Sequence, residues 1–456
     1  MSKNAMDIYV EVSPAETRAA KVDSEGLMHE FVIERICDAS LVGGIYLGRV
    51  VRVEKGMDAA FVDIGIGENG LINKAKGIAE GQWVVVQVTR DARDAKGPAL
   101  TLNPALLGRY LGYTPGRKGI NWARAVGKGR DRAGLETILS DMNIDMDGFS
   151  IRGAAISANA GLLLAEFERL QTRWAAIQEG AKQRKARLLE APVSLFFKML
   201  RDAERETRFA LDDRALHLQA KKLVAQEMPD LKDNLAFHQG PEALFEEAGV
   251  NEQLEDGLSR VVELNGGGSL VFDRTEAMIV IDVNMGQGAK HGDDAVFKVN
   301  YLAAEEICRQ ITLRNLSGLI VIDFISMKNK NRAKKLVELM RQRMNKDARH
   351  ADVLGLTAAG LIEITRQREG LSLDDQMLQF SRTHIRPLPV AQGAEILRAA
   401  LKLKGAGRPI AYGSTLVIEA LKGPLESALA ETSRRLGQQL MLRVGDDLNP
   451  PNVEMD

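Results

Sequence analysis

The stretches MIVIDVN (278–284) and LIVID (319–323) are two short apolar runs that each carry an aspartate at the same depth, Asp282 and Asp323. Continuous runs of aliphatic residues of this length predict strands that are buried on both faces. Between the runs, apolar residues recur at close to helical spacing, at Val296, Val299, Ala303, Ile307 and Ile311. The order strand, helix, strand predicts a βαβ unit in which the two strands are parallel and adjacent.

Asp282 and Asp323 would then emerge together at the carboxyl edge of the sheet, where α/β proteins build their sites. Two acidic side chains that converge there suit a hard divalent cation such as Mg²⁺. A second interpretation stays open, because an aspartate after a strand is often only a helix N-cap or a turn former. The matching context of the two aspartates across one crossover favours the metal site.

The composition indicates a multidomain globular protein without a dominant charge. The chain has 456 residues, with 61 Lys and Arg against 62 Asp and Glu, so its net charge does not itself indicate a nucleic-acid binder. The basic residues are unevenly distributed: residues 117–132 carry six Lys or Arg against one acid, and residues 327–349 carry nine against two. Such segments either track phosphates or form a solvated helix face. The second segment follows Asp323 directly, which favours phosphate contact.

The two cysteines, Cys37 and Cys308, lie far apart in apolar surroundings. They predict buried free thiols in a reducing compartment, without a disulfide framework or a zinc cluster. The sequence has no recognisable signal peptide and no apolar stretch near the roughly eighteen residues of a membrane span. We therefore expect a soluble cytoplasmic protein with no membrane partner.

Residues 40–105 alternate strand-like runs with glycine turns, which predicts a small β-barrel of the OB type, a common nucleic-acid binder. Phe61 is either an aromatic on which a base stacks or part of the barrel core. The segment 241–263 reads as a helix, and the glycine triplet at 266–268 predicts a hairpin turn more strongly than a phosphate cradle.

Longer motifs around the aspartates resemble the catalytic core of the ribonuclease E/G family. They read GGGSLVFDRTEAMIVIDVNMG (266–286), GLIVIDFISM (318–327) and DVLGLTAAGLIEITRQR (352–368). The segment GGIYLGRVVRVEKGMDAAFVDIGIGENGLI (43–72) is similar to the S1 domain of that family. The order of the segments also agrees, so the resemblance covers nearly the whole chain.

The resemblance implies an α/β multidomain fold. It comprises a split RNase H-like domain with an inserted S1 (OB-fold) β-barrel, a 5′-sensor-like region, a DNase I-like catalytic α/β domain and a small C-terminal domain. The implied boundaries are residues 1–39 plus 200–273 for the RNase H-like domain, 40–118 for S1, 119–199 for the sensor-like region, 274–382 for the catalytic domain, 383–393 for a linker and 394–456 for the small domain.

The resemblance also implies an Mg²⁺-dependent endoribonuclease that hydrolyses single-stranded RNA and leaves 5′-phosphate products. Asp282 and Asp323 would hold one catalytic Mg²⁺, with Asn284 orienting the site from the same side of the strand. Phe61 and Lys96 match RNA-contacting positions of the S1 domain. Arg152 matches the arginine of a pocket that senses the 5′-monophosphate of the substrate.

Several positions depart from the family pattern. Leu71 replaces the second S1 aromatic, Gly153 replaces the threonine of the 5′-sensor, Ser326 replaces a second aspartate, and His350 replaces a basic residue expected near the site. The cysteines of the family's zinc link are absent, and residues 386–389 read Arg-Pro-Leu-Pro instead. We therefore expect no zinc, and any homo-oligomer would form without a zinc link.

Two other functions stay open. The departures fit a non-catalytic or weakly active RNA-binding protein of the same fold, whereas the intact set Asp282, Asn284 and Asp323 argues against it. A DNA nuclease is a third possibility, because two carboxylates and a metal do not themselves read the 2′-hydroxyl.

Overall fold

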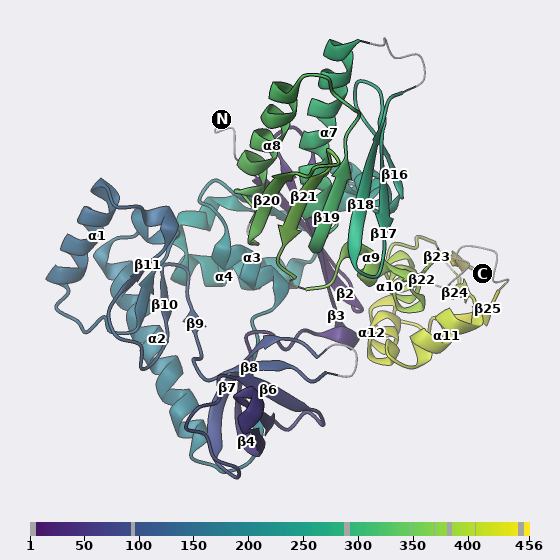
Figure 1. Cartoon of the computed structure of the whole chain (residues 1–456). Helices are drawn as coiled ribbons and strands as arrows, with labels where there is room; N and C mark the ends of the chain where they lie inside the picture. The colour runs from purple at the N-terminus through teal and green to yellow at the C-terminus, as the bar shows by residue number, and fades with distance from the viewer. Residues whose placement is uncertain are drawn as a thin grey trace. The chain divides into compact units, whose positions relative to one another are not determined.

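The computed structural model describes residues 6–92, 96–286, 292–347, 349–368, 370–380, 385–405, 407–445 and 451–456. The chain forms two compact units, each assembled from separate stretches of sequence (Figure 1). Unit 1 comprises Met1–Cys37, Arg208–Asp213 and Phe237–Asp456, and unit 2 comprises Asp38–Thr207 and Arg214–Ala236. Among the described residues, none of the helices has the length and apolar character that a membrane crossing requires.

A six-stranded sheet forms the centre of unit 1, in the order β16-β17-β18-β19-β21-β20. Its strands are β16 (Val261–Glu263), β17 (Ser269–Arg274), β18 (Met278–Asn284), β19 (Gly318–Asp323), β20 (Ala351–Leu356) and β21 (Ile362–Arg366). The two strands predicted from the sequence, β18 and β19, are parallel neighbours. The helix predicted between them is α7 (Asp293–Leu313), and α8 (Lys330–Met344) follows β19. The βαβ prediction is therefore confirmed.

The prediction that β18 and β19 are buried on both faces is wrong. Ile279, Ile281 and Val283 are buried with residues of α7 and α8 in one apolar core. Val280, on the other face, is only half-buried, and Asp282 is exposed. Both faces carry aliphatic side chains, so hydrophobicity alone did not reveal that the helices cover one face of the sheet.

The glycine triplet forms the predicted hairpin turn between β16 and β17. Gly266, Gly267 and Gly268 all have φ values between 98° and 115°, a region that L side chains rarely adopt. A Cβ on Gly268 would also lie 2.7 Å from the backbone oxygen of Asn284. Only glycine therefore allows this turn to pack against the end of β18.

The segment 241–263 is not the single helix predicted from its sequence. It contains two short helices, α5 (Leu244–Glu247) and α6 (Val250–Leu258), followed by strand β16. Gly249, with a φ of 62°, separates the two helices. The left-handed conformation at this glycine interrupts the helical path, and the residues after α6 join the sheet.

A second sheet in unit 1 has the order β15-β14-β1-β2-β3. Its strands are β1 (Met6–Val12), β2 (Glu16–Asp23), β3 (Met28–Arg35), β14 (Arg208–Leu211) and β15 (Leu235–Phe237), and the boundary between the units falls within β15. Cys37 lies just beyond β3 and is exposed, which corrects the prediction that both thiols are buried; Cys308, on α7, is buried as expected.

Buried acidic groups of this second sheet have basic or backbone partners. Glu11 accepts hydrogen bonds from Arg18 Nε at 3.0 Å and from Phe245 N at 3.1 Å. Asp212, just after β14, accepts only the backbone N–H of Val12 in the recorded hydrogen bonds of the described residues, at 2.9 Å. Burial raises the pKa of Asp212 to about 6, against the effect of that hydrogen bond. Its carboxylate is therefore less well stabilised than that of Glu11.

The carboxyl-terminal part of unit 1 is a small mixed segment. Its elements are α9 (Leu373–Met377), β22 (Leu378–Phe380), β23 (Ile385–Pro387), α10 (Pro389–Ala400), β24 (Pro409–Gly413), α11 (Thr415–Lys422), α12 (Glu426–Leu436), β25 (Met441–Val444) and β26 (Asn452–Met455). The predicted linker 383–393 overlaps β23 and the start of α10, and residues 383–384 lie outside the described residues. The division into six segments stays a prediction.

A closed five-stranded barrel forms one part of unit 2, consistent with the predicted OB-type barrel. Its strands follow the order β4-β5-β6-β8-β7, and β4 also pairs with β7 and closes the barrel. They are β4 (Ile45–Glu54), β5 (Ala59–Asp63), β6 (Asn69–Asn73), β7 (Trp83–Arg90) and β8 (Ala99–Thr101), with β13 (Arg187–Glu190) alongside β4.

The rest of unit 2 combines a small sheet with helices. The sheet has the order β11-β12-β10-β9. These elements are β9 (Leu106–Leu107), β10 (Leu111–Tyr113), β11 (Asn121–Trp122), β12 (Phe149–Ile151), α1 (Arg130–Asp141), α2 (Ala160–Ala181), α3 (Leu195–Asp202) and α4 (Arg214–Glu227).

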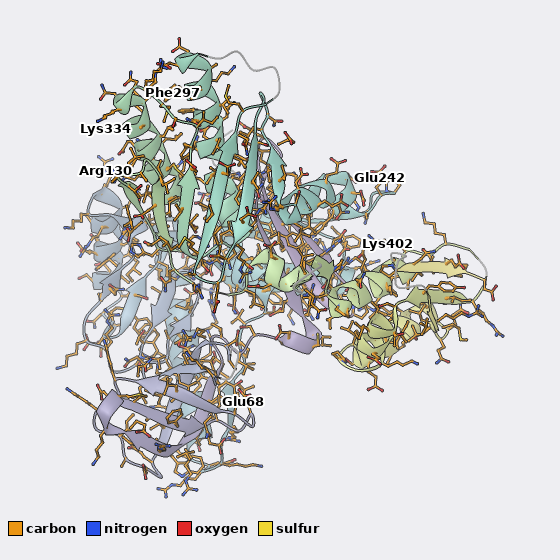
Figure 2. All side chains as sticks on the ribbon, turned by 45° about the vertical axis from the view of Figure 1, so that its right-hand side comes forward. Glu68, Arg130, Glu242, Phe297, Lys334 and Lys402 are labelled. Atoms are coloured by element: carbon orange, nitrogen blue, oxygen red, sulfur yellow. The ribbon has the colours of Figure 1, made fainter. Side chains whose placement is uncertain are left out.

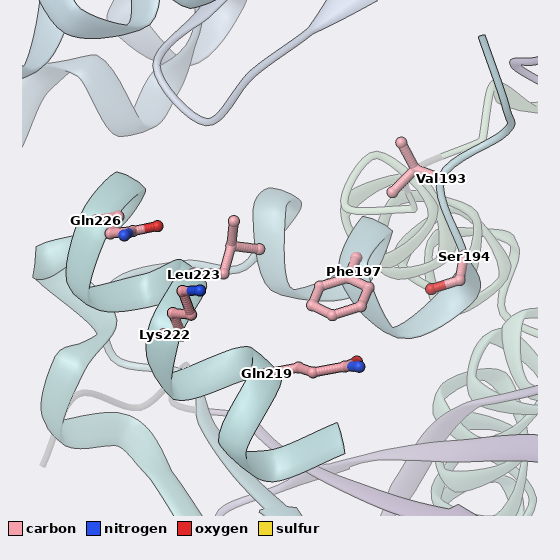
Figure 3. A pocket seen from close by; sticks show the side chains of 7 residues that line it. All are labelled: Val193, Ser194, Phe197, Gln219, Lys222, Leu223 and Gln226. Atoms are coloured by element: carbon pink, nitrogen blue, oxygen red, sulfur yellow. The ribbon is translucent and has the colours of Figure 1, made fainter. Parts of the chain in front are cut away.

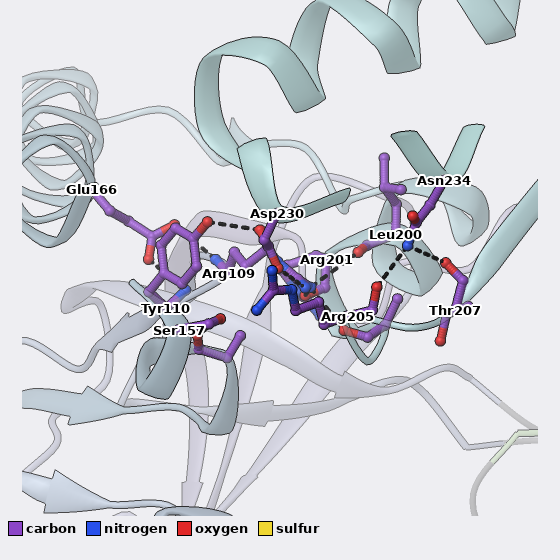
Figure 4. A network of polar contacts seen from close by, with 12 residues as sticks. Arg109, Tyr110, Ser157, Glu166, Leu200, Arg201, Arg205, Thr207, Asp230 and Asn234 are labelled. Carbon is purple, nitrogen blue, oxygen red and sulfur yellow. Dashed lines mark hydrogen bonds and ion pairs between the residues drawn. The ribbon is translucent and has the colours of Figure 1, made fainter. Parts of the chain in front are cut away.

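A buried polar network connects these elements within unit 2 (Figure 4). Glu166 of α2 accepts hydrogen bonds from three successive backbone N–H groups, those of Arg109, Tyr110 and Leu111, at 2.6–2.7 Å. The Arg109 guanidinium binds Asp230 with Nε 3.1 Å from each carboxylate oxygen, and the Tyr110 hydroxyl donates to Asp230 at 2.8 Å. Arg109 is 1% exposed. The network holds the start of β10 against α2 and the turn at Asp230.

Candidate catalytic site

The candidate site lies in unit 1, at the carboxyl ends of β18 and β19. Asp282 and Asp323 are direct partners in the parallel register, and both side chains are exposed on the face that α7 and α8 leave uncovered. Since neighbouring strands lie about 4.8 Å apart, the two carboxylates extend side by side from adjacent strands. The structure therefore brings together the two aspartates that the sequence singled out.

Asn284 completes this arrangement on the same face of β18. Its Nδ2 donates a hydrogen bond to Oδ2 of Asp282 at 2.8 Å, as expected for residues two apart on a strand. The bond restricts the rotation of the Asp282 carboxylate and leaves its other oxygen available. Across the sheet, Ser269 of β17 is the register partner of Asn284.

The electrostatic setting of the pair is unusual for adjacent acids. Within the described part of the chain, no ion pair to Lys, Arg or His is recorded for either Asp282 or Asp323, although other carboxylates of unit 1 have such partners. Two like charges side by side repel each other unless a cation lies between them. Two carboxylates and an amide oxygen are also the hard oxygen ligands that Mg²⁺ prefers. The donor set therefore fits a divalent cation.

A residue that the sequence reasoning missed fixes the loop after Asp323. Asn300 of α7 is fully buried, and its amide makes two hydrogen bonds to the backbone of Ile325: Nδ2 donates to the carbonyl at 2.8 Å, and Oδ1 accepts from the N–H at 3.1 Å. This clamp lies two residues beyond Asp323. The available signal was a polar residue inside the apolar stripe of the predicted helix, next to Val299.

The expectation that His350 lies near the aspartates is wrong. His350 precedes β20, whose first residue Ala351 pairs with Arg366, and Arg366 pairs with Gly318 at the start of β19. Gly318 lies five residues before Asp323, or about 16 Å along the strand. His350 is therefore at the opposite end of the sheet, where its Nε2 lies 3.3 Å from Asp352.

Phe61 lies on the outer surface of the barrel in unit 2. It is half-buried, its register partner on β6 is Leu71, and the barrel core is made of other residues such as Ala60, Val62 and Ile72. Phe61 is therefore not part of the buried barrel core, and stacking of a base on it stays a prediction. Its neighbour across the strand pair, Leu71, is aliphatic.

Lys96 is exposed and begins the short connection to β8. A Cβ on the next residue, Gly97, would lie 2.0 Å from the backbone oxygen of Asn69, so this connection packs against the start of β6. Lys96 thus belongs to the barrel that carries Phe61. Residues 93–95, which precede it, lie outside the described residues.

Arg152, directly after β12 in unit 2, already has acceptors within the protein. Its guanidinium donates to the Gly108 carbonyl and forms an ion pair with Asp202 at 2.5 Å. Arg201 donates two hydrogen bonds to the same carboxylate, both at 2.8 Å. Although burial works in the other direction, hydrogen bonds and charge from these arginines lower the pKa of Asp202. No sequence signal had linked Asp202 to Arg152.

A groove elsewhere in unit 2 lies between α3 and α4 (Figure 3). It is lined by Val193, Ser194, Phe197, Gln219, Lys222, Leu223 and Gln226. This lining has an apolar floor but no carboxylate, histidine or cysteine that could hold a metal or move a proton. The groove therefore does not compete with the aspartate pair as a hydrolytic centre.

Comparisons with known proteins agree on one family. The sequence profile of the Ribonuclease E/G family matches residues 105–369. Ribonuclease G of Escherichia coli (strain K12) is 31% identical over 473 residues, covering 96% of each chain. Ribonuclease G of Haemophilus influenzae is 30% identical over 400 residues, covering 81% of each chain. Ribonuclease E of Escherichia coli (strain K12) is 30% identical over 387 residues, covering 79% of this chain and 36% of the relative.

Proposed function

The chain belongs to the ribonuclease E/G family, as its motifs predicted, and on this premise we propose that it is an endoribonuclease. It would hydrolyse phosphodiester bonds in single-stranded RNA, depend on one Mg²⁺, and leave 5′-phosphate products. The observation that carries the proposal is the pair Asp282 and Asp323, in register on parallel strands and exposed without a recorded basic partner among the described residues.

The residues of the site have separable roles in this proposal. Asp282 and Asp323 would hold the cation, Asn284 would orient Asp282 through the hydrogen bond of 2.8 Å, and Asn300 would fix the backbone that follows Asp323. A cation bound there would supply an activated water and stabilise charge that develops on the phosphate. Both carboxylates are exposed, which lets an extended RNA strand reach them.

The barrel of unit 2 would supply further RNA contacts. Phe61 offers a ring on the barrel surface on which a base can stack, and Lys96 offers a positive charge for a phosphate. The neighbour Leu71 provides apolar contact but no second aromatic face. We therefore expect the barrel to bind RNA with modest affinity and with little preference among the bases.

To be recognised at Arg152, a 5′-monophosphate would have to compete with Asp202 for the guanidinium. A phosphate must displace Asp202, which forms the ion pair at 2.5 Å. Arg201 could keep Asp202 neutralised while Arg152 turns to the phosphate. A preference for 5′-monophosphorylated over 5′-hydroxyl RNA would show that the phosphate wins.

The direct test is to incubate the full chain with an unstructured 5′-monophosphorylated RNA, with Mg²⁺ and with EDTA. The proposal predicts internal cleavage with Mg²⁺ only, and 5′-phosphates on the downstream products. A DNA oligomer of the same sequence serves as the matched control for the nuclease alternative. RNA binding without cleavage under all conditions would instead support the non-catalytic RNA-binding protein.

The same preparation tests the predicted absence of zinc. Residues 386–389 contain no cysteine, so any homo-oligomer should keep its mass after treatment with a zinc chelator. Light scattering before and after chelation measures this.

A further inference from the structure

The basic segment 327–349 divides into two kinds of residue in the structure. Its arginines with recorded contacts serve the fold: Arg332 binds Asp294 and the Asp293 carbonyl, Arg341 donates to the Val353 carbonyl at 3.2 Å, and Arg343 pairs with Glu305. The lysines near the start of α8 make no such recorded contacts among the described residues. We call Lys328, Lys330, Lys334 and Lys335 the lysine patch.

The lysine patch is exposed to solvent. All four residues are exposed, and no ion pair or hydrogen bond of their ammonium groups is recorded among the described residues. Figure 2 shows Lys334 extending away from α8, with Phe297 on the neighbouring α7. The acidic residue of α8, Glu338, accepts a hydrogen bond from Gln342 and is not paired with a patch lysine.

The position of the patch is unfavourable for the helix that carries it. Positive charges are stabilising near the carboxyl end of a helix and destabilising near its amino end, where the helix dipole is positive. Lys330 is the first residue of α8, Lys334 and Lys335 lie in its second turn, and Lys328 precedes the N-cap residue Asn329. The helix dipole therefore does not explain the two lysines nearest this end, Lys328 and Lys330. Sequences that contradict local stability are expected at functional sites.

The patch also lies at the carboxyl edge of the sheet, where the two aspartates are. β19 ends at Asp323 and α8 begins at Lys330, so the amino end of α8 starts from the same carboxyl edge that carries Asp282. The side chain of Arg332 fixes this end of α8 to the start of α7, with its guanidinium 5.3 Å from the centre of the Phe297 ring. The lysines therefore start from the same edge of the sheet as the aspartate pair, on the layer of helices that covers the other face.

We propose that the lysine patch binds backbone phosphates of the single-stranded RNA that lies across Asp282 and Asp323. This inference rests on the proposed function and adds a substrate-binding surface to its site. A row of ammonium groups suits phosphates without reading base identity. The patch would offset the repulsion between the RNA and the two carboxylates.

The experiment measures RNA binding as a function of salt in the Asp282→Asn background, so that the substrate is not cleaved. The patch variant is Lys330→Gln/Lys334→Gln/Lys335→Gln. The control variant, Lys346→Gln/Lys404→Gln/Lys422→Gln, removes the same charge from exposed lysines of unit 1 that lie outside the patch. The probe is a short unstructured fluorescent RNA.

The patch variant should lower the slope of log affinity against log salt by about 2, since each phosphate contact on a single strand contributes about 0.7. The control should keep the parent slope. Because Lys330 opposes the helix dipole and Lys334 and Lys335 are exposed, the unfolding temperature of the patch variant should be unchanged or slightly higher. A slope equal to that of the parent would overturn the proposal.

The same data separate this inference from the proposed function. If the unsubstituted chain cleaves RNA but the patch variant keeps the parent slope, only the lysine surface is wrong. If the unsubstituted chain does not cleave RNA but the slope falls by about 2, the surface stands and the catalytic assignment fails.

Discussion

The carboxylates of the network in unit 2 and those of the candidate site in unit 1 have opposite surroundings. Glu166 accepts three backbone N–H groups, and Asp230 accepts hydrogen bonds from Arg109 and Tyr110 (Figure 4). Asp282 accepts one recorded hydrogen bond, from the neutral amide of Asn284, and no acceptor contact of Asp323 is recorded among the described residues. One pair is satisfied inside the protein; the other keeps its oxygens for an external ligand.

These opposite surroundings separate the structural acids of this chain from the functional ones. If burial were the only criterion for a functional acid, it would point to Glu166 and Asp230, because burying a charge costs free energy. Their donors are complete, so they have no capacity left for chemistry. The aspartates of the site are instead exposed, lie next to each other in register and have no recorded basic partner among the described residues.

The largest expected effect is on catalysis. Asp282→Asn or Asp323→Asn should lower cleavage of RNA by about 10³-fold or more, because the site loses a charged ligand for the cation that activates water. Single-turnover cleavage assays with saturating Mg²⁺ measure this.

The same variants should fold normally, since both side chains are exposed and relief of their mutual repulsion is favourable. RNA affinity without Mg²⁺ should be equal to or slightly higher than that of the parent. Cleavage at the parent rate in either variant would remove the aspartates from the mechanism.

The second effect is on stability and concerns the satisfied pair. Arg109→Met leaves Asp230 buried without its cation and should destabilise unit 2 by about 3 to 5 kcal/mol. Chemical denaturation, followed by the fluorescence of tryptophans that all lie in unit 2, measures the loss.

The double variant Arg109→Met/Asp230→Leu removes both charges and should recover part of that stability. Cleavage per folded molecule should stay close to that of the parent in both variants. An equally large loss of activity per folded molecule would contradict the division into structural and functional carboxylates.

Asp212 is an intermediate case, a buried carboxylate with one recorded donor among the described residues. Burial raises its pKa to about 6 from 3.8, so the folded state holds its proton more tightly than the unfolded state. Its contribution to stability is present below about pH 4 and is lost as the pH rises through about 6. Asp212→Asn keeps the acceptor for Val12 N and should stabilise the protein by about 2 to 3 kcal/mol at neutral pH.

The measurement for Asp212→Asn is a pair of denaturation curves, at neutral pH and near pH 4. The variant and the parent should be equally stable at the acidic value. A gain of the same size at both pH values would show that ionisation of Asp212 is not its cause.

The smallest effect concerns the clamp after Asp323. Asn300→Ala removes both hydrogen bonds to Ile325 and should lower kcat by about 10-fold, with a smaller change in KM, since outer-shell partners position metal ligands. Steady-state kinetics over a range of Mg²⁺ concentrations measures this. A merely structural role would lower stability but leave kcat and the Mg²⁺ requirement of the folded enzyme unchanged.

The sequence was informative where a local pattern has one structural solution. Two aliphatic runs flanking a helical stripe predicted the parallel pair, and the spacing of two residues predicted that Asn284 shares a face with Asp282; both are confirmed. The barrel followed from short runs punctuated by glycines. Family motifs then identified the chain.

The sequence was uninformative where tertiary packing decides. It could not show that the helices cover one face of β18 and β19, because Val280 and Ile281 are equally apolar. It placed His350 beside the site because linear motifs do not reveal which end of a strand a residue precedes. The pairing of Arg152 with Asp202 joins residues 50 positions apart, which no local pattern predicts.

The two aspartates share a face of the sheet only if β18 and β19 pair in the observed register. A slip of one residue in β19 would turn Asp323 to the face covered by α7 and α8, where its charge would be buried. The turn before β19 contains Asn315, with a φ of 51°, and β19 itself begins at Gly318, with a φ of 91°. A deletion of one residue in that turn should therefore place the aspartates on opposite faces of the sheet in an otherwise complete chain. The pairing register of two strands thus decides whether the catalytic site can form.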